Sequence, residues 1–87
     1  MPNVLSRAKE LERRFQNYAP VQSQEKIKKV LQMYKDKSNM NFTVVQNMAM
    51  ALYSPTLLGK KNVDKMYENF LSKYQIGMPS PLTTPGG

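Results

Sequence analysis

The sequence predicts an all-α fold, a small compact bundle of three to four helices followed by a flexible C-terminal tail rich in proline and glycine. Two observations predict it. Apolar residues recur at the three- and four-residue spacing of helices, and no segment shows the alternating pattern of a strand. The 87 residues are enough for one modest hydrophobic core. We therefore expect a single helical domain at residues 1–77 and an extended or disordered tail at residues 78–87.

The first expected helix covers residues 3–18 and is followed by a break at Ala19 and Pro20. Its apolar residues are spaced by three or four positions, which places them on one face: Val4, Ala8, Leu11, Phe15 and Tyr18. A second helix follows, with Ser23 as its expected N-cap, because the hydroxyl can accept from a free amide of the first turn. The apolar face of this helix consists of Ile27, Val30, Leu31 and Tyr34.

The third expected helix, VVQNMAMALY at residues 44–53, is apolar nearly all round. A helix with so little polar surface belongs in the middle of a bundle. The turn-forming letters SNMN at residues 38–41 precede it, and Thr43 and Gln46 have the spacing of a reciprocal capping box.

The last expected helix covers residues 60–74 and follows Pro55, a short turn at residues 56–58 and Gly59. Its periodicity is the clearest in the chain, with an apolar face of Val63, Met66, Tyr67, Phe70, Leu71 and Tyr74. Gly77 is expected to end this helix. Three prolines and two glycines in the last ten residues exclude a further helix.

The residue types argue against catalysis. The chain has no cysteine and no histidine, which removes thiolate nucleophiles, imidazole bases and the usual transition-metal ligands. Asp64 and Glu68 form a carboxylate pair one helical turn apart, but calcium needs far more oxygen ligands, and nearby lysines explain the pair equally well. We therefore expect a non-catalytic protein with no metal, no cofactor and no small-molecule substrate.

The net charge of +7 favours an anionic partner, and nucleic acid is the leading hypothesis. The candidate phosphate-contacting residues are Arg7, Arg13, Arg14, Lys28, Lys29, Lys35, Lys60 and Lys61. Lys28 and Lys35 share one flank of the second helix, and they gain importance if the arginine edge of the first helix lies alongside them. Such a surface would bind the backbone with little sequence specificity. The lysines of the second helix lie on both sides of its apolar face, however, as in an ordinary solvated helix.

The alternative is a protein–protein assembly or structural module. Met33 lies off the apolar face of its helix and Met50 lies on a helix with surplus apolar surface, so both are candidate docking residues. Met78 and Leu82 would extend this docking surface into the tail. A third hypothesis, an amphipathic binder of membrane surfaces, fits the charge but requires exposed apolar helix faces.

The location of the protein is expected to be intracellular, in the cytoplasm or nucleus, because the N-terminal residues carry charges from Arg7 onward and lack the apolar core of a secretory signal. The uncharged residues 38–59 are long enough to span a membrane, but their polar residues and Pro55 indicate a buried helix instead. The terminal Gly86 and Gly87 resemble the product of the Gly-Gly-directed maturation proteases of adenovirus-like large DNA viruses. That resemblance implies a virion component, and an ordinary flexible end is the other interpretation.

Overall fold

The computed structural model describes residues 3–36 and 40–75, and these residues form helices joined by short connections. The elements are α1 (Val4–Arg14), η1 (Gln16–Tyr18), α2 (Val21–Asp36), α3 (Phe42–Tyr53), η2 (Pro55–Leu57) and α4 (Lys60–Tyr74), where η marks a 3₁₀ turn. No strand occurs within these residues, so the expected all-α fold is confirmed. The tail expected at residues 78–87 and the helix end expected at Gly77 lie outside the described residues.

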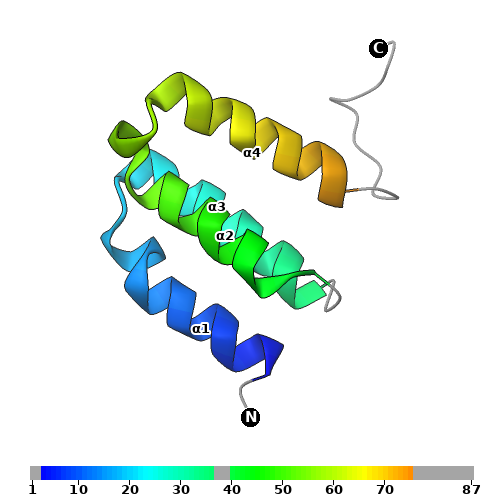
Figure 1. Cartoon of the computed structure of the whole chain (residues 1–87). Helices are drawn as coiled ribbons and strands as arrows, with labels where there is room; N and C mark the ends of the chain where they lie inside the picture. Colours follow the sequence, from blue (N-terminus) through cyan, green and yellow to red (C-terminus); the bar gives the residue numbers. More distant parts are fainter. Residues whose placement is uncertain (1–2, 37–39, 76–87) are drawn as a thin grey trace.

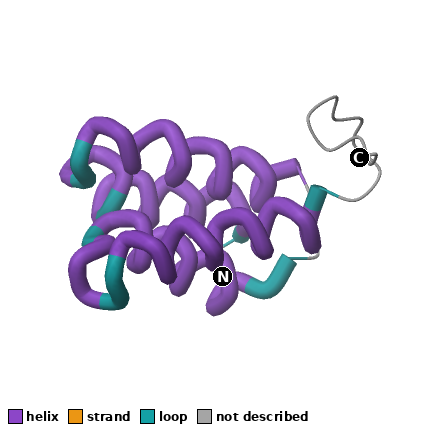
Figure 2. The backbone as a smooth tube through the Cα atoms, turned by 90° about the horizontal axis from the view of Figure 1, so that it is seen from above, coloured by secondary structure: helices purple, strands orange, loops and turns teal. Residues whose placement is uncertain are grey.

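The four α-helices run antiparallel to their neighbours in sequence, with α2 and α3 between α1 and α4 (Figure 1). The α1–α2 and α3–α4 connections therefore lie at the same end of the bundle, as the view from above also shows (Figure 2). The start of α1 and the end of α4 lie at the opposite end.

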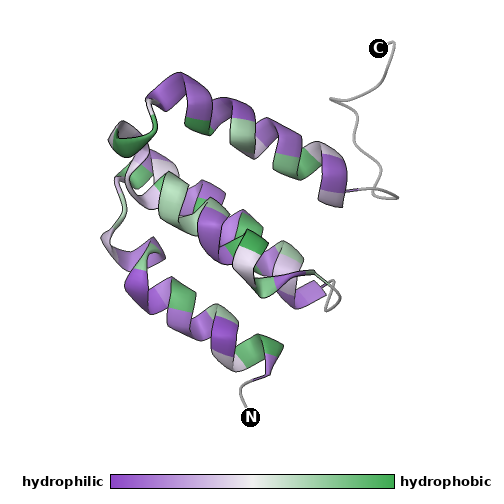
Figure 3. Ribbon diagram, in the orientation of Figure 1, coloured by the Kyte–Doolittle hydropathy of each residue, from purple (hydrophilic) through white to green (hydrophobic). Residues whose placement is uncertain are grey.

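The core lies where α3 packs against the other three helices. Five residues of α3 are buried: Val45, Met48, Ala49, Ala51 and Leu52. The central position expected for this apolar helix is therefore confirmed. The other helices turn apolar residues toward it, which is visible in α4, where the hydrophobic residues face the middle of the bundle and the hydrophilic ones face outward (Figure 3).

The ends of α1 and α2 correct the sequence prediction. The α-helix ends at Arg14 rather than at residue 18, because the chain turns at Phe15 and continues as the short η1 turn. Tyr18 consequently leaves the apolar face and is 75% exposed. The second helix begins at Val21, before the expected cap. The carbonyl of Pro20 accepts the first amide bonds, and Ser23 is a buried residue inside the first turn.

The start of α3 is capped by Asn41, not by the expected pair of Thr43 and Gln46. The Asn41 side-chain oxygen accepts from the amide nitrogens of Thr43 and Val44 at 2.8 and 3.3 Å. The cap therefore comes from the predicted turn, and the helix begins two residues earlier than expected, at Phe42.

The last part of the chain follows the prediction closely. A turn forms at η2, and α4 has the expected bounds of 60–74. Gly59 precedes α4 with a φ of +91°, a conformation that residues with a side chain rarely adopt. The sharp change of direction between η2 and α4 therefore depends on glycine.

Candidate functional site

A lysine-lined groove runs between α1 and α2. Lys28 and Lys35 lie two helical turns apart on the flank of α2 that faces α1, and Lys9 lies on the facing flank of α1. The groove has a volume of about 70 Å³. It is lined by Ala8, Lys9, Glu12, Gln16, Lys28, Leu31, Gln32 and Lys35, which we call the α1/α2 lysine groove.

The charge of this groove is positive. It contains three lysines and only one carboxylate, Glu12, and in the part of the chain that the structure describes none of the three lysines has an acidic partner within 4.0 Å. The helix rise of 1.5 Å per residue places Lys28 and Lys35 about 10 Å apart along α2. The groove thus presents spaced ammonium groups and the neutral amide of Gln16. Such groups bind phosphate oxygens. The amide nitrogen of Gln32 donates to the carboxylate of Asp36 at 3.1 Å.

The arginine edge of α1 lies elsewhere. The guanidinium carbon of Arg7 is 4.8 Å from the centroid of the Phe42 ring of α3. That of Arg14 is 5.3 Å from the centroid of the Phe15 ring, and its Nη1 lies 3.8 Å from Glu10. The buried stripe of α1 separates this edge, which faces α3, from the flank that faces α2. The arginines therefore do not lie alongside Lys28 and Lys35.

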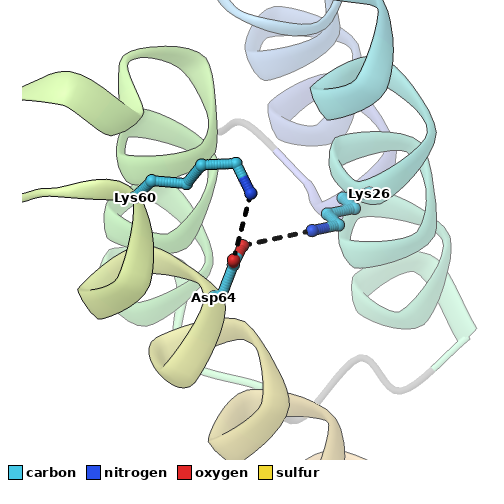
Figure 4. Close-up of polar contacts among 3 residues, drawn as sticks. All are labelled: Lys26, Lys60 and Asp64. Carbon is cyan, nitrogen blue, oxygen red and sulfur yellow. Dashed lines mark hydrogen bonds and ion pairs between the residues drawn. The ribbon is translucent and has the colours of Figure 1, made fainter.

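An ion-pair cluster joins α2 to α4 (Figure 4). One oxygen of Asp64 accepts from Lys26 at 3.4 Å and the other accepts from Lys60 at 3.3 Å. The hydrogen bond from Lys60 is the main cause that lowers the pKa of Asp64, Lys26 adds to the effect, and partial desolvation opposes it. Lys26 also lies 5.2 Å from the ring centroid of Tyr67, whose pKa is raised by burial.

This cluster involves Lys60 in an internal contact, although the sequence had suggested it as a phosphate ligand. The pairing of Asp64 with Lys60 was foreseeable from their spacing, but that with Lys26 was not, because it depends on how α2 and α4 pack. Among the described residues no group of three or more acidic side chains could hold a metal ion.

The remaining predicted cations are dispersed over three helices. Arg13, Lys29 and Lys61 are all exposed, on α1, α2 and α4 respectively. The structure places only Lys28 and Lys35 of the predicted set in the α1/α2 lysine groove. It adds Lys9, Gln16 and Gln32, which sequence reasoning missed because the phase of a helix does not reveal which flank meets its neighbour.

The predicted docking methionines behave differently from one another. Met33 is only 5% exposed, so its predicted place on the surface is wrong. Met33 is buried on α2, on the same flank as Lys26, which lies two turns earlier in the helix. Lys26 contacts α4 through its ion pair with Asp64. Met50, at 47% exposed, is accessible on the outer face of α3. Met78 and Leu82 lie outside the described residues.

A second groove, mainly apolar, lies between α3 and α4. Its volume is about 330 Å³. It is lined by Val44, Asn47, Met48, Met66, Asn69, Phe70, Lys73 and Tyr74, which we call the α3/α4 groove. It contains one cation and no carboxylate, so it offers an apolar surface with two amide side chains rather than a site for chemistry.

Comparisons with known proteins do not assign this arrangement to a family. No model of a known protein family, no curated protein and no solved structure matches the chain. Within the described residues no helix is both long enough and apolar enough to cross a bilayer.

Proposed function

We propose that the protein is a non-catalytic binding module, part of a larger assembly, that contacts the phosphate backbone of nucleic acid through the α1/α2 lysine groove. One observation supports this proposal above all. Lys9, Lys28 and Lys35 converge on one groove, and among residues 3–36 and 40–75 no acidic side chain forms an ion pair with any of them. Cations at a shared surface, without acidic partners, favour a polyanion.

The composition of the groove also supports weak sequence specificity. Lysine is a point charge that contacts phosphate, and phosphate contacts position a protein without reading bases. Among the residues that the structure describes, Gln16 and Gln32 are the only amide side chains that line the groove. We therefore expect the groove to bind the regularly spaced phosphates of nucleic acid without distinguishing between base sequences.

A salt series tests this proposal. Binding of a labelled single strand and of a duplex is measured by fluorescence anisotropy, and the affinity is expected to fall steeply with salt. Removing two phosphate contacts by Lys28→Gln with Lys35→Gln lowers the slope of log K against log salt by about 1.4 to 1.8. Binding that is absent at low salt, or insensitive to salt, overturns the proposal.

A matched control separates the groove from the overall charge. The double variant Lys65→Gln with Lys73→Gln loses the same two charges from α4, a helix that contributes no residue to the groove. It is expected to retain most of the slope. An equal loss in both double variants would show that net charge, rather than the α1/α2 lysine groove, determines binding.

The second candidate function is that of a protein–protein assembly module. The observation that favours it is the apolar α3/α4 groove together with the exposed Met50 on the same helix. Methionine adapts its shape to varied partners. Sedimentation of the chain tests this candidate, since a stable oligomer that Val44→Ser with Met50→Ser weakens would favour it. A monomer at all concentrations removes the support for self-assembly.

A further inference from the structure

One end of the bundle exposes large apolar side chains. Both connections at this end contribute, the α1–α2 connection at η1 and the α3–α4 connection at η2 (Figure 1). The exposed fractions are 75% for Tyr18, 79% for Val21, 38% for Tyr53, 80% for Leu57 and 50% for Leu58. We call these five residues the apolar end. The strongly hydrophobic residues of the α3–α4 connection stand out there in Figure 3.

The two connections belong to one continuous end. The rings of Phe15 and Tyr53 lie with centroids 5.4 Å apart, which fastens the start of the first connection to the end of α3. Residues 15–24 and 50–59 contain no charged residue, although charged residues make up 22% of the sequence. A protein with many charges thus leaves one end without any, and exposes leucine, valine and tyrosine there.

Cations lie directly behind the apolar end. Arg13 and Arg14 occupy the last turn of α1, and Lys60 and Lys61 occupy the first turn of α4. Arg14 and Lys60 have acidic partners, whereas Arg13 and Lys61 have none within 4.0 Å among the described residues. An uncharged tip is therefore followed by a basic collar.

We propose that the apolar end docks on the surface of an anionic lipid bilayer. Leu57, Leu58 and Val21 enter the boundary between headgroups and acyl chains, and the tyrosines remain at the headgroup level, where their rings and hydroxyls are both accommodated. Arg13 and Lys61 contact anionic headgroups, whose surface potential attracts cations. The apolar surface that a membrane binder requires is thus provided by the connections, while the helix faces are used for the core.

The positive charge of the basic collar favours an anionic bilayer over a second copy of this protein. Two copies meeting end to end would bring two basic collars together, which like charges disfavour. A protein partner is expected to bind where a groove can enclose its side chains. None of the five residues of the apolar end lines the α1/α2 lysine groove or the α3/α4 groove. Exposed apolar side chains gathered at one end and backed by cations suit a soft anionic surface.

Insertion is measured with a single tryptophan, because the chain contains none. Leu57→Trp is mixed with vesicles of phosphatidylcholine containing phosphatidylserine, and with vesicles of phosphatidylcholine alone. We expect a blue shift and quenching by brominated lipid with the anionic vesicles. Leu5→Trp is the control, because Leu5 is also an exposed leucine, at 54%, and lies in the first turn of α1 at the opposite end of the bundle. Equal responses of the two variants, or no response of Leu57→Trp, overturn the proposal.

The affinity for vesicles then tests each part of the surface by co-sedimentation. Leu57→Ser with Leu58→Ser is expected to weaken binding to anionic vesicles by about tenfold or more. Arg13→Gln with Lys61→Gln is expected to weaken it by about tenfold or more, since each cation near the surface contributes about 1 kcal/mol. Lys65→Gln with Lys73→Gln carries the same charge change elsewhere and is expected to have a smaller effect.

Three outcomes contradict the proposal. Equal binding to anionic and neutral vesicles would leave the collar without a role. Unchanged binding of the leucine double variant would show that charge alone holds the protein to the vesicle. In the third outcome the protein binds to no vesicle, while the leucine double variant has a smaller oligomeric mass in solution than the unmodified protein. That result would show that the apolar end is a contact between protein chains. Nucleic-acid binding by the leucine variant is measured in parallel and is expected to be unaffected, which separates this proposal from that on the lysine groove.

Discussion

Phe15 and Tyr53 pack with ring centroids 5.4 Å apart and ring planes inclined by 57°. Phe15 is the C-cap residue that follows α1 and is 8% exposed, and Tyr53 is the last residue of α3. This contact lies where the chain leaves α1, and η1 and α3 pack against each other there. The same contact brings the two connections of the apolar end together.

The Phe15–Tyr53 contact is expected to be energetically coupled. In a double-mutant cycle with Phe15→Leu and Tyr53→Leu, the coupling free energy should be about 0.5–1.5 kcal/mol, the range for aromatic pairs. Urea unfolding of the four proteins measures it. Phe15→Leu combined with Tyr18→Leu is the control, because the exposed Tyr18 is in no aromatic pair among the described residues. That control should be additive, and additivity in the Tyr53 cycle as well would contradict the prediction.

The cap of α3 gives a second prediction. Asn41→Ala should lower the free energy of unfolding by about 1 kcal/mol, because it leaves the amides of Thr43 and Val44 without their acceptor. Thr43→Ala should change the stability by less than about 0.5 kcal/mol, since its side chain is exposed and does not cap the helix. Thermal or urea unfolding compares the two variants. A larger loss for Thr43→Ala would restore the capping box that the sequence suggested.

The two methionines of α2 and α3 provide a third prediction. Met33→Ala removes a buried side chain and should cost about 2–5 kcal/mol of stability, whereas Met50→Ala should change it by less than about 0.5 kcal/mol. Chemical denaturation measures both. Similar small effects of the two substitutions would mean that Met33 is not part of the core in solution.

Helix periodicity predicted the bounds of a helix best where one face of the helix is buried and where glycine or proline marks its ends. In α4 the spacing of Val63 to Tyr74 and the preceding Gly59 were enough to predict both bounds. Where a helix is packed from two sides, the buried arc is wider than its apolar stripe. Met33 lies beyond the stripe of Ile27, Val30, Leu31 and Tyr34, and it is nevertheless part of the buried core. It lies on the flank of α2 from which Lys26 pairs with Asp64 of α4.

The binding surface was less predictable than the fold. The shared flank of Lys28 and Lys35 follows from helix phase alone. Their neighbour across the groove does not, because α1 has two polar flanks, one with Lys9 and the other with Arg7, and packing decides which of them meets α2. The apolar end was missed for a related reason, since Tyr18 was assigned to a helix that ends at Arg14.

Asp64 gives the fourth prediction, a stability that depends on pH. Its pKa in the folded protein is lowered from the ordinary value of 3.8, chiefly by the hydrogen bond from Lys60. A lowered pKa stabilises the folded state at pH values above 3.8, and this contribution disappears as the pH falls through the lowered value. Asp64→Asn should therefore be less stable than the unmodified protein near neutral pH, with the difference closing in acid.

The measurement is the free energy of unfolding in urea of both proteins across the acid range. Glu68→Gln is the matched control, because Glu68 lies one turn later on α4 and has no ion pair among the described residues. It should follow the pH dependence of the unmodified protein. Lys26→Gln should reduce the difference only in part, since Lys60 remains bound to the second oxygen of Asp64. A constant difference between Asp64→Asn and the unmodified protein at all pH values would show that the carboxylate is not stabilised by its lysines.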